Sequence, residues 1–297
     1  MFNNKKTLFS AILIITILSI SMTNVLGAND NTVYVSTTGN DANTGTSDSP
    51  FKTLHKAAEA IPDGGTILIK AGTYKDESDN RIVFYNSNNY VIKGDDPNTT
   101  ILIGKTIQVG GHTSTELTHP TVTVQGLTFT GTAASSTGAG TSPLLSRGLA
   151  THINVNNCIF VDNNDTAIGG SSSYVTVVNS SFINNHGNFA SFVGAIYVDC
   201  KSDISNCNFV NNTGKHAGAI YSHTGVGLVI NDSSFSGNVA TNHIYHDEGN
   251  DIYTVYTTWL NNCVFAPVPV GSPQSGTPSL GKADHYVAVY VINGVSV

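Results

Sequence analysis

A short motif recurs five times between residues 153 and 265, and this repetition limits the possible folds more than any other feature of the sequence. The copies read NNCIFVDNN, NSSFINN, NCNFVNN, DSSFSGN and NNCVF. They align on Phe160, Phe182, Phe209, Phe235 and Phe265, at steps of 22, 27, 26 and 30 residues. A period in this range is the signature of a repeat protein, in which each copy forms one coil that stacks on the next.

The residue two positions before each phenylalanine is always small, as in Cys158 and Ser180. Residues two apart in a strand point to the same face, so we expect these small residues and the phenylalanines to fill the inside of the coil. Three of the four cysteines, Cys158, Cys207 and Cys263, belong to this column. These three cysteines would lie at least two coils apart, which is beyond the reach of a disulfide. We therefore predict free thiols, and the one plausible disulfide is Cys200–Cys207.

Asparagine or aspartate flanks each phenylalanine at fixed distances. The residues three positions before are Asn157, Asn179, Asn206, Asp232 and Asn262, and those three positions after the first four phenylalanines are Asn163, Asn185, Asn212 and Asn238. Both residue types tolerate left-handed backbone at bends. Coils stacked at about 4.8 Å would join such side chains into hydrogen-bonded ladders.

These asparagine and aromatic columns resemble those of the right-handed parallel β-helix in the pectate-lyase-like superfamily. The N-terminal part matches secreted members in a second way, through a Gly-Asn-Asp loop at residues 39–50, Gly-Gly-Thr-Ile at residues 64–67 and Gly-Thr-Tyr at residues 72–74. The resemblance implies an all-β solenoid whose first coil is covered by a short helix. The apolar spacing after Pro50 predicts that capping helix at about residues 51–61.

The segments before and after the expected solenoid differ in composition from the repeats. Two lysines, an apolar run and small residues near Gly27 indicate a secretory signal peptide at residues 1–27. We assign the β-helix with its cap to residues 31–265. Residues 266–297 begin with a proline- and glycine-rich stretch, which predicts a cap or linker followed by a terminal strand.

One turn of each coil varies in length and is the candidate binding edge. The distances from the first four phenylalanines to Ile168, Ile196, Ile220 and Ile252 are 8, 14, 11 and 17 residues. Insertions at one turn of a solenoid collect along one edge. We expect ligand contacts there from His186, Phe189, Phe192, Lys215, His216, Tyr245, His246, Asp247 and Glu248.

Charge restricts the class of partner. Without the signal peptide the formal charge is −9, because that segment holds two lysines and no acidic residue. An acidic surface argues against nucleic acid or an anionic membrane as a partner. We expect no cofactor, although Asp247, Glu248 and Asp251 have the oxygen ligands of a weak Ca²⁺ site.

Motifs of the enzymes in the resembled superfamily are missing. The chain has two arginines, neither of which sits in the repeated strands beside an acidic pair. We find no signature of a polygalacturonase, pectate lyase or pectin methylesterase. The repeats also resemble adhesin-like surface proteins of methanogenic archaea, which implies adhesion or surface recognition. The sequence therefore favours a secreted or cell-surface, non-catalytic protein that binds a glycan or partner at the long-turn edge, with no catalytic residue assigned. The alternatives are a polysaccharide lyase or hydrolase centred on His246, Asp247 and Glu248, and a purely structural envelope protein.

Overall fold

The structure is a computed structural model, and its described residues all belong to the unit formed by residues 31–297. They are residues 31–75, 81–84, 88–110, 120–133, 142–187, 193–223, 227–241, 249–266, 279–282 and 289–296, with backbone alone at 148–150 and 295–296. The expected signal peptide lies outside the described residues. Among these residues no helix is both long and apolar enough to cross a membrane.

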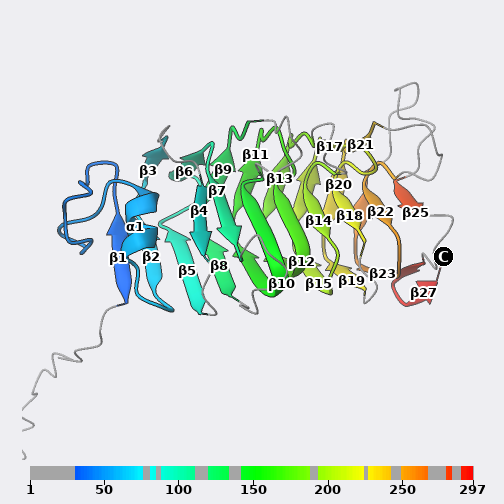
Figure 1. Cartoon of the computed structure of the whole chain (residues 1–297). Helices are drawn as coiled ribbons and strands as arrows, with labels where there is room; N and C mark the ends of the chain where they lie inside the picture. Colours follow the sequence, from blue (N-terminus) through cyan, green and yellow to red (C-terminus); the bar gives the residue numbers. More distant parts are fainter. Residues whose placement is uncertain are drawn as a thin grey trace, which may run out of the picture. The chain divides into compact units, whose positions relative to one another are not determined.

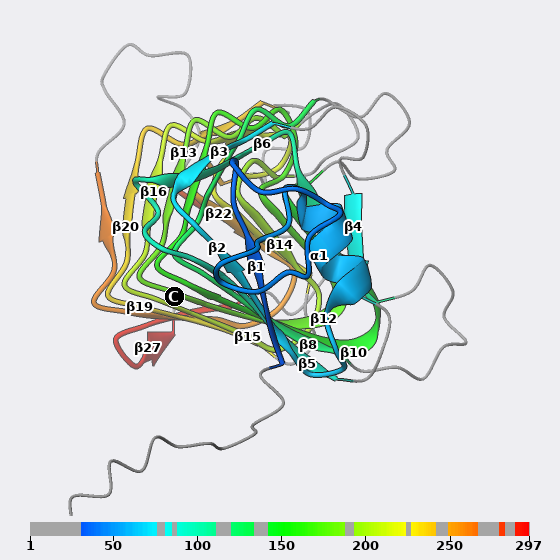
Figure 2. The ribbon, with the colours of Figure 1, turned by 90° about the vertical axis from the view of Figure 1, so that its left-hand side faces the viewer.

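The strands form a right-handed parallel β-helix, as predicted, in which each coil contributes strands to three parallel ladders (Figure 1). The first ladder contains β4 (Arg81–Phe84), β7 (Thr106–Val109), β10 (Leu144–Asn156), β12 (Ile168–Val178), β14 (Ile196–Val198), β18 (Ile220–Ser222), β22 (Ile252–Thr254) and β25 (Leu280–Lys282). Figure 2 looks along the stack and shows successive coils superposed. Within these ladders every described strand except the first and the last has a parallel neighbour on both sides.

The second ladder contains β1 (Thr32–Val35), β2 (Thr66–Ile69), β5 (Asn89–Gly94), β8 (Thr121–Gln125), β15 (Ser202–Ser205), β19 (Leu228–Asn231), β23 (Thr258–Asn261) and β26 (Tyr290–Ile292). The long strands β10 and β12 run through the first and second ladders and join them into one sheet. At its end β26 pairs antiparallel with β27 (Val295–Ser296). The parallel pairing thus continues past Phe265, through β25 and β26.

The third ladder carries the repeated phenylalanines. It contains β3 (Gly72–Tyr74), β6 (Thr100–Ile103), β9 (Thr128–Thr130), β11 (Ile159–Val161), β13 (Ser181–Ile183), β16 (Asn208–Val210), β20 (Ser234–Ser236) and β24 (Val264–Phe265). From Phe129 to Phe265 the six rings stack inside the coils, with neighbouring centroids 4.8 to 5.0 Å apart and planes within 10°. The predicted inward column is confirmed, since Cys158, Ser180, Cys207 and Ser233 are buried beside them.

Asparagines close the corners of the coils. Asn157, Asn179, Asn206, Asp232 and Asn262 all have φ between 49° and 53°, the left-handed region that was predicted for them. The second set is fully or almost fully buried, and its side chains form a continuous ladder through Asn163, Asn185, Asn212 and Asn238 at 2.8 to 2.9 Å. Each amide also donates to the backbone carbonyl of a phenylalanine in the preceding coil. The buried asparagine side chains therefore find their hydrogen-bond partners within the repeats themselves.

The capping helix is present but shorter than predicted, because α1 spans Leu54–Ala60. Phe51 belongs to an extended segment that bridges to Val35, and Thr53 is the extended N-cap whose hydroxyl accepts from the Lys56 N–H. Leu54 and Ala57 join the core cluster, and α1 packs against β1 and β4. The four cysteines are free.

Candidate functional site

Three tyrosines stack on the outside of the first ladder. Tyr197, Tyr221 and Tyr253 are the middle residues of β14, β18 and β22 and pair in register. Their ring centroids are 5.5 Å and 5.1 Å apart, with interplanar angles of 34° and 22°. The residues on either side of each tyrosine are buried, so the alternation of the strand turns the rings outward.

The stack spans three coils because its neighbours in the ladder are glycines. Gly169 in β12 pairs with Tyr197, and Gly281 in β25 pairs with Tyr253. A small apolar cluster of Val193, Ala217 and Val255 packs under the rings. Tyr253 is 7% exposed and belongs to this base, whereas Tyr197 and Tyr221 are half-buried.

Two histidines extend the aromatic surface. The His216 ring lies 5.5 Å from that of Tyr253 and 5.9 Å from that of Tyr221. The exposed His223 ring lies 6.2 Å from Tyr221. His216 comes from the turn of variable length, so the stack lies next to the predicted binding edge.

A carboxylate and a thiol lie beside the first tyrosine. Asp199 accepts hydrogen bonds from the Ser172 N–H and the Ser171 hydroxyl. Burial raises the pKa of Asp199, although these two hydrogen bonds and the nearby His223 oppose the shift. Burial, and then the charge of Asp199, raise the pKa of Tyr197 and that of Cys200. The Tyr197 phenol is therefore neutral at physiological pH and can both donate and accept hydrogen bonds.

We call these residues the tyrosine face: Tyr197, Asp199, His216, Tyr221, His223 and Tyr253. It offers aromatic ring surface, two imidazoles, phenol hydroxyls and one carboxylate. Such a surface can bind a ligand that has an apolar face and a polar edge, because aromatic rings cover the first and the polar groups hydrogen-bond to the second.

The structure gives different outcomes for the predicted binding residues. His186, Lys215 and His216 are described, and the backbone of His186 bridges to Thr213, two residues before Lys215 in the next coil. Of the three, His216 is the one whose ring lies against the tyrosines. Phe189, Phe192, Tyr245, His246, Asp247 and Glu248 lie outside the described residues, and their roles stay predictions.

Asp251, the remaining member of the suggested Ca²⁺ site, is 4% exposed and accepts a hydrogen bond from the Asn238 amide at 2.8 Å. It therefore terminates the buried asparagine ladder. Within the described part of the chain, no group of three or more His, Cys, Asp or Glu side chains is arranged to hold a metal ion.

The isoleucines directly before these tyrosines were aligned from the sequence, but the tyrosine stack was not predicted. The signal was present, since each tyrosine directly follows an aligned isoleucine, at Ile196, Ile220 and Ile252. An aromatic residue at one outward position in three successive coils predicts a stack there, by the same reasoning that predicted the inner phenylalanines.

Comparison with solved structures gives several β-helix proteins. The chain is similar to pectin methylesterase PemA from Erwinia chrysanthemi (TM-score 0.46, 14% identity, 89% of this chain and 90% of that chain). It is also similar to the PL6 family alginate lyase AlyGC (TM-score 0.49, 14% identity, 89% and 39%) and to pectate lyase Pel9A (TM-score 0.48, 14% identity, 87% and 74%). At these identities the similarity concerns the fold alone.

Two comparisons concern sequence. The chain is 38% identical over 73 residues to the uncharacterized protein YwoF of Bacillus subtilis (strain 168), an alignment that covers 21% of this chain and 16% of that protein. Residues 37–265 match the family described as "Protein of unknown function (DUF1565)". This match includes the capping helix, the five repeats and the tyrosine face, and the chain therefore belongs to the DUF1565 family.

Proposed function

We propose that this protein is an extracellular carbohydrate-binding β-helix protein and that a glycan chain lies across the tyrosine face. The observation that carries the proposal is the outward stack of Tyr197, Tyr221 and Tyr253 beside the turn of variable length. The phenylalanine stack fills the inside of the coil, and the tyrosines form a second aromatic stack outside it, over the small apolar cluster of Val193, Ala217 and Val255.

The chemistry of a sugar ring fits this surface. A pyranose has a face of C–H groups and an edge of hydroxyls. Because the tyrosine rings stack on one another, Tyr197 and Tyr221 present apolar ring edges and phenol hydroxyls side by side to a ligand. Asp199 is an acceptor for sugar hydroxyls, while His223 is an exposed side chain at the edge of the stack. The stack runs across successive coils, which suits an extended ligand.

The test is a glycan array probed with labelled protein lacking residues 1–27. We expect binding to one class of glycan and its loss in Tyr221→Leu, which keeps an apolar side chain but removes the ring. Tyr174→Leu is the matched control, because Tyr174 is an exposed tyrosine on β12 that stacks on His152. A Tyr221→Leu variant that binds like the wild type would rule out the tyrosine face as the site.

A second candidate is a polysaccharide-active enzyme, which several of the similar solved structures are by their titles. The observation that favours it is Asp199, a carboxyl whose pKa is raised by burial and that lies near the imidazole of His223. A carboxyl with a raised pKa is suited to general acid catalysis.

A turnover screen on uronate polymers and neutral glycans, with and without Ca²⁺, tests this second candidate. Activity that is lost in Asp199→Asn would assign the reaction to the tyrosine face. Activity lost instead in Glu248→Gln would assign it to the long turn, the centre predicted from the sequence. Glycan binding without turnover would support a carbohydrate-binding protein and not an enzyme.

A further inference from the structure

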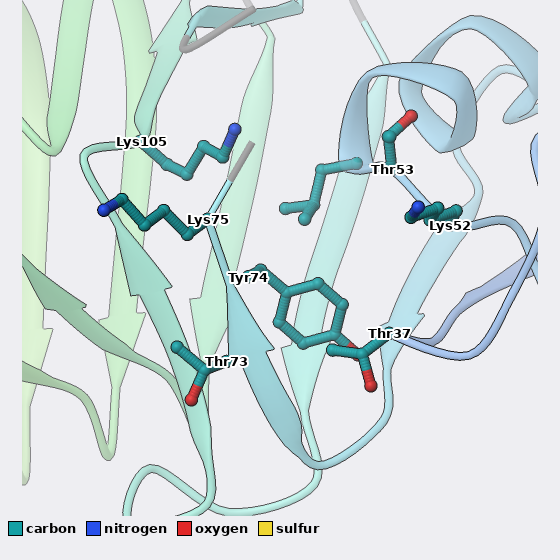
Figure 3. A pocket seen from close by; sticks show the side chains of 8 residues that line it. Thr37, Lys52, Thr53, Thr73, Tyr74, Lys75 and Lys105 are labelled. Atoms are coloured by element: carbon teal, nitrogen blue, oxygen red, sulfur yellow. The ribbon is translucent and has the colours of Figure 1, made fainter. Parts of the chain in front are cut away.

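The third ladder has an outer face as regular as its core. Its inward positions hold Tyr74, Leu102 and the phenylalanine stack, so the alternate residues of its eight strands point outward. Figure 3 shows this alternation at β3, where the Thr73 side chain and the Tyr74 ring extend to opposite sides of the strand. We call the outward side chains of these eight strands the third-ladder face.

Two rows of side chains cross the third-ladder face from coil to coil. One row pairs in register from β6 to β20 and is mainly β-branched: Ile103, Thr130, Val161, Ile183, Val210 and Ser236. The first five of these are partly exposed, and Ser236 is exposed. The other row includes the partly exposed Ile101 and Ile159 and ends at Val264, which is 65% exposed. Both rows therefore present apolar surface to the solvent.

The third ladder also differs from the other two in charge. None of its eight strands contains a charged residue, whereas Arg81 and Arg147 lie in strands of the first ladder, and Lys93 and Asp203 lie in strands of the second. The chain without residues 1–27 has a formal charge of −9, so two copies repel one another. The third-ladder face is the sheet face on which that repulsion opposes close contact least.

Amide side chains border this face at the corners of the coils. Asn157, Asn179 and Asn206 stand before its strands, and Asn184 and Asn211 stand after them, with aspartates at the equivalent positions Asp162 and Asp232. Asn179 donates to Asn156 at 3.2 Å and accepts from Asn206 at 2.6 Å. An amide has a second N–H and a second lone pair, so a row of amides can pair with another copy of itself.

We infer that the third-ladder face is a self-association surface, on which a second copy of this chain packs face to face about a two-fold axis. The coils of both copies repeat at the same spacing of about 4.8 Å, so the side-chain rows of one copy fit between those of the other along the whole face. A two-fold interface requires a self-complementary surface. Uncharged β-branched rows between rows of amides meet that requirement.

The size of the face agrees with a weak dimer. Eight strands about 4.8 Å apart, with five steps of about 3.3 Å from Asn157 to Asp162, give a face of about 34 Å by 16 Å. Two such faces bury about 1,100 Å² together, just above the area of about 1,000 Å² that a specific interface needs. The dimer is therefore reversible. The tyrosine face lies on the first ladder, so each dimer presents two of them.

Sedimentation equilibrium of the protein lacking residues 1–27 tests the inference. Val161→Lys/Val210→Lys adds two ammonium groups to the third-ladder face of each copy. Val91→Lys/Val229→Lys is the matched control, because these partly exposed valines point outward from β5 and β19 of the second ladder. We expect a monomer–dimer equilibrium in the wild type and the control, and a dissociation constant at least tenfold higher in Val161→Lys/Val210→Lys. Added sodium chloride should strengthen the wild-type dimer, because it screens the repulsion between acidic copies.

A wild type that stays monomeric at concentrations up to about 1 mM would overturn the inference. A dimer that is equally tight in Val161→Lys/Val210→Lys, equally weakened in the control, or dissociated by salt would also overturn it, by placing the contact on another face. Circular dichroism verifies that the variants are folded. Ser181→Lys keeps the test decisive if the double variant does not fold, because Ser181 is partly exposed in the middle of the face and its loss removes no apolar packing. An unchanged dimer in Ser181→Lys would rule out this face.

Discussion

Asn238 donates a hydrogen bond from its side-chain amide to Oδ1 of Asp251 at 2.8 Å, so the buried asparagine ladder ends on a carboxylate. All members of the ladder donate in the same direction along the stack. The Thr132 hydroxyl begins the series by donating to Oδ1 of Asn163 at 3.2 Å. A carboxylate is an apt terminus, since an ionised carboxylate accepts hydrogen bonds and donates none.

The end of the ladder predicts a pH-dependent stability. Burial raises the pKa of Asp251 to about 6, above the value of about 3.9 for an unfolded chain. A raised folded-state pKa stabilises the fold below pH 4, and that contribution is lost as the pH rises through 6. Asp251→Asn keeps the acceptor and abolishes the titration, so we expect it to be more stable at pH 7 by up to about 3 kcal/mol. Urea unfolding of both proteins from pH 4 to pH 7.5 measures this, and parallel pH profiles would contradict it.

The interior of the ladder predicts a large loss from a single truncation. Asn185 is fully buried, and its side chain bonds Asn163, Asn212 and the Phe160 carbonyl. Asn185→Ala removes these three buried hydrogen bonds, while Asn212 Oδ1 keeps the Asn185 backbone N–H and the Asn163 amide keeps the Phe129 carbonyl. The loss should lower the free energy of unfolding by about 3 kcal/mol. Asn154→Ala, at a half-buried position on β10, is the control and should cost less than about 1 kcal/mol. Similar costs at the two positions would show that the ladder does not stabilise the coil.

The phenylalanine stack predicts a gradient between its middle and its end. Phe182 is fully buried between Phe160 and Phe209, whereas Phe265 is the last ring and is partly exposed. Phe182→Ala should cost about 3 to 5 kcal/mol through lost burial and a cavity, and Phe265→Ala clearly less. Urea denaturation compares the two variants. A larger cost at Phe265 would contradict the packing described for this column.

The left-handed corners predict different effects of glycine and alanine on stability. Asn157 has φ 51° and is exposed, so its backbone conformation dominates the effect of a substitution. Asn157→Ala should destabilise by about 1 kcal/mol, because a Cβ disfavours this region, and Asn157→Gly should be close to neutral. Thermal unfolding of the pair decides the point, and equal melting temperatures would refute the backbone explanation.

The core of the fold could be predicted from the sequence because it is made by repetition. Phe160 recurs in the same place in all five repeats, and Asn157 recurs in four of the five with Asp232 in the other. In a parallel stack such equivalent residues lie next to one another. The capping helix was predicted too long because the same apolar spacing continues through Phe51, whose backbone pairs with Val35 instead. Tertiary strand pairing overrides local helical pattern there.

The candidate sites were harder to predict because they depend on contacts between different parts of the chain. The tyrosine face combines an outward strand position with His216, which comes from a turn of variable length. Asp251 looked like a metal ligand because it follows Asp247 and Glu248, but its place in the ladder follows from the length of the turn before it. Neither the contact between His216 and the tyrosines nor the place of Asp251 in the ladder can be predicted from spacing in the sequence alone.

The most direct test of the central claim is a calorimetric titration of the best array glycan into wild type, Tyr221→Leu and Tyr174→Leu. The account predicts that Tyr221→Leu binds at least tenfold more weakly, because the central ring of the stack is lost, while Tyr174→Leu matches the wild type. Equal affinity in Tyr221→Leu and the wild type would contradict the claim that the tyrosine face binds the glycan.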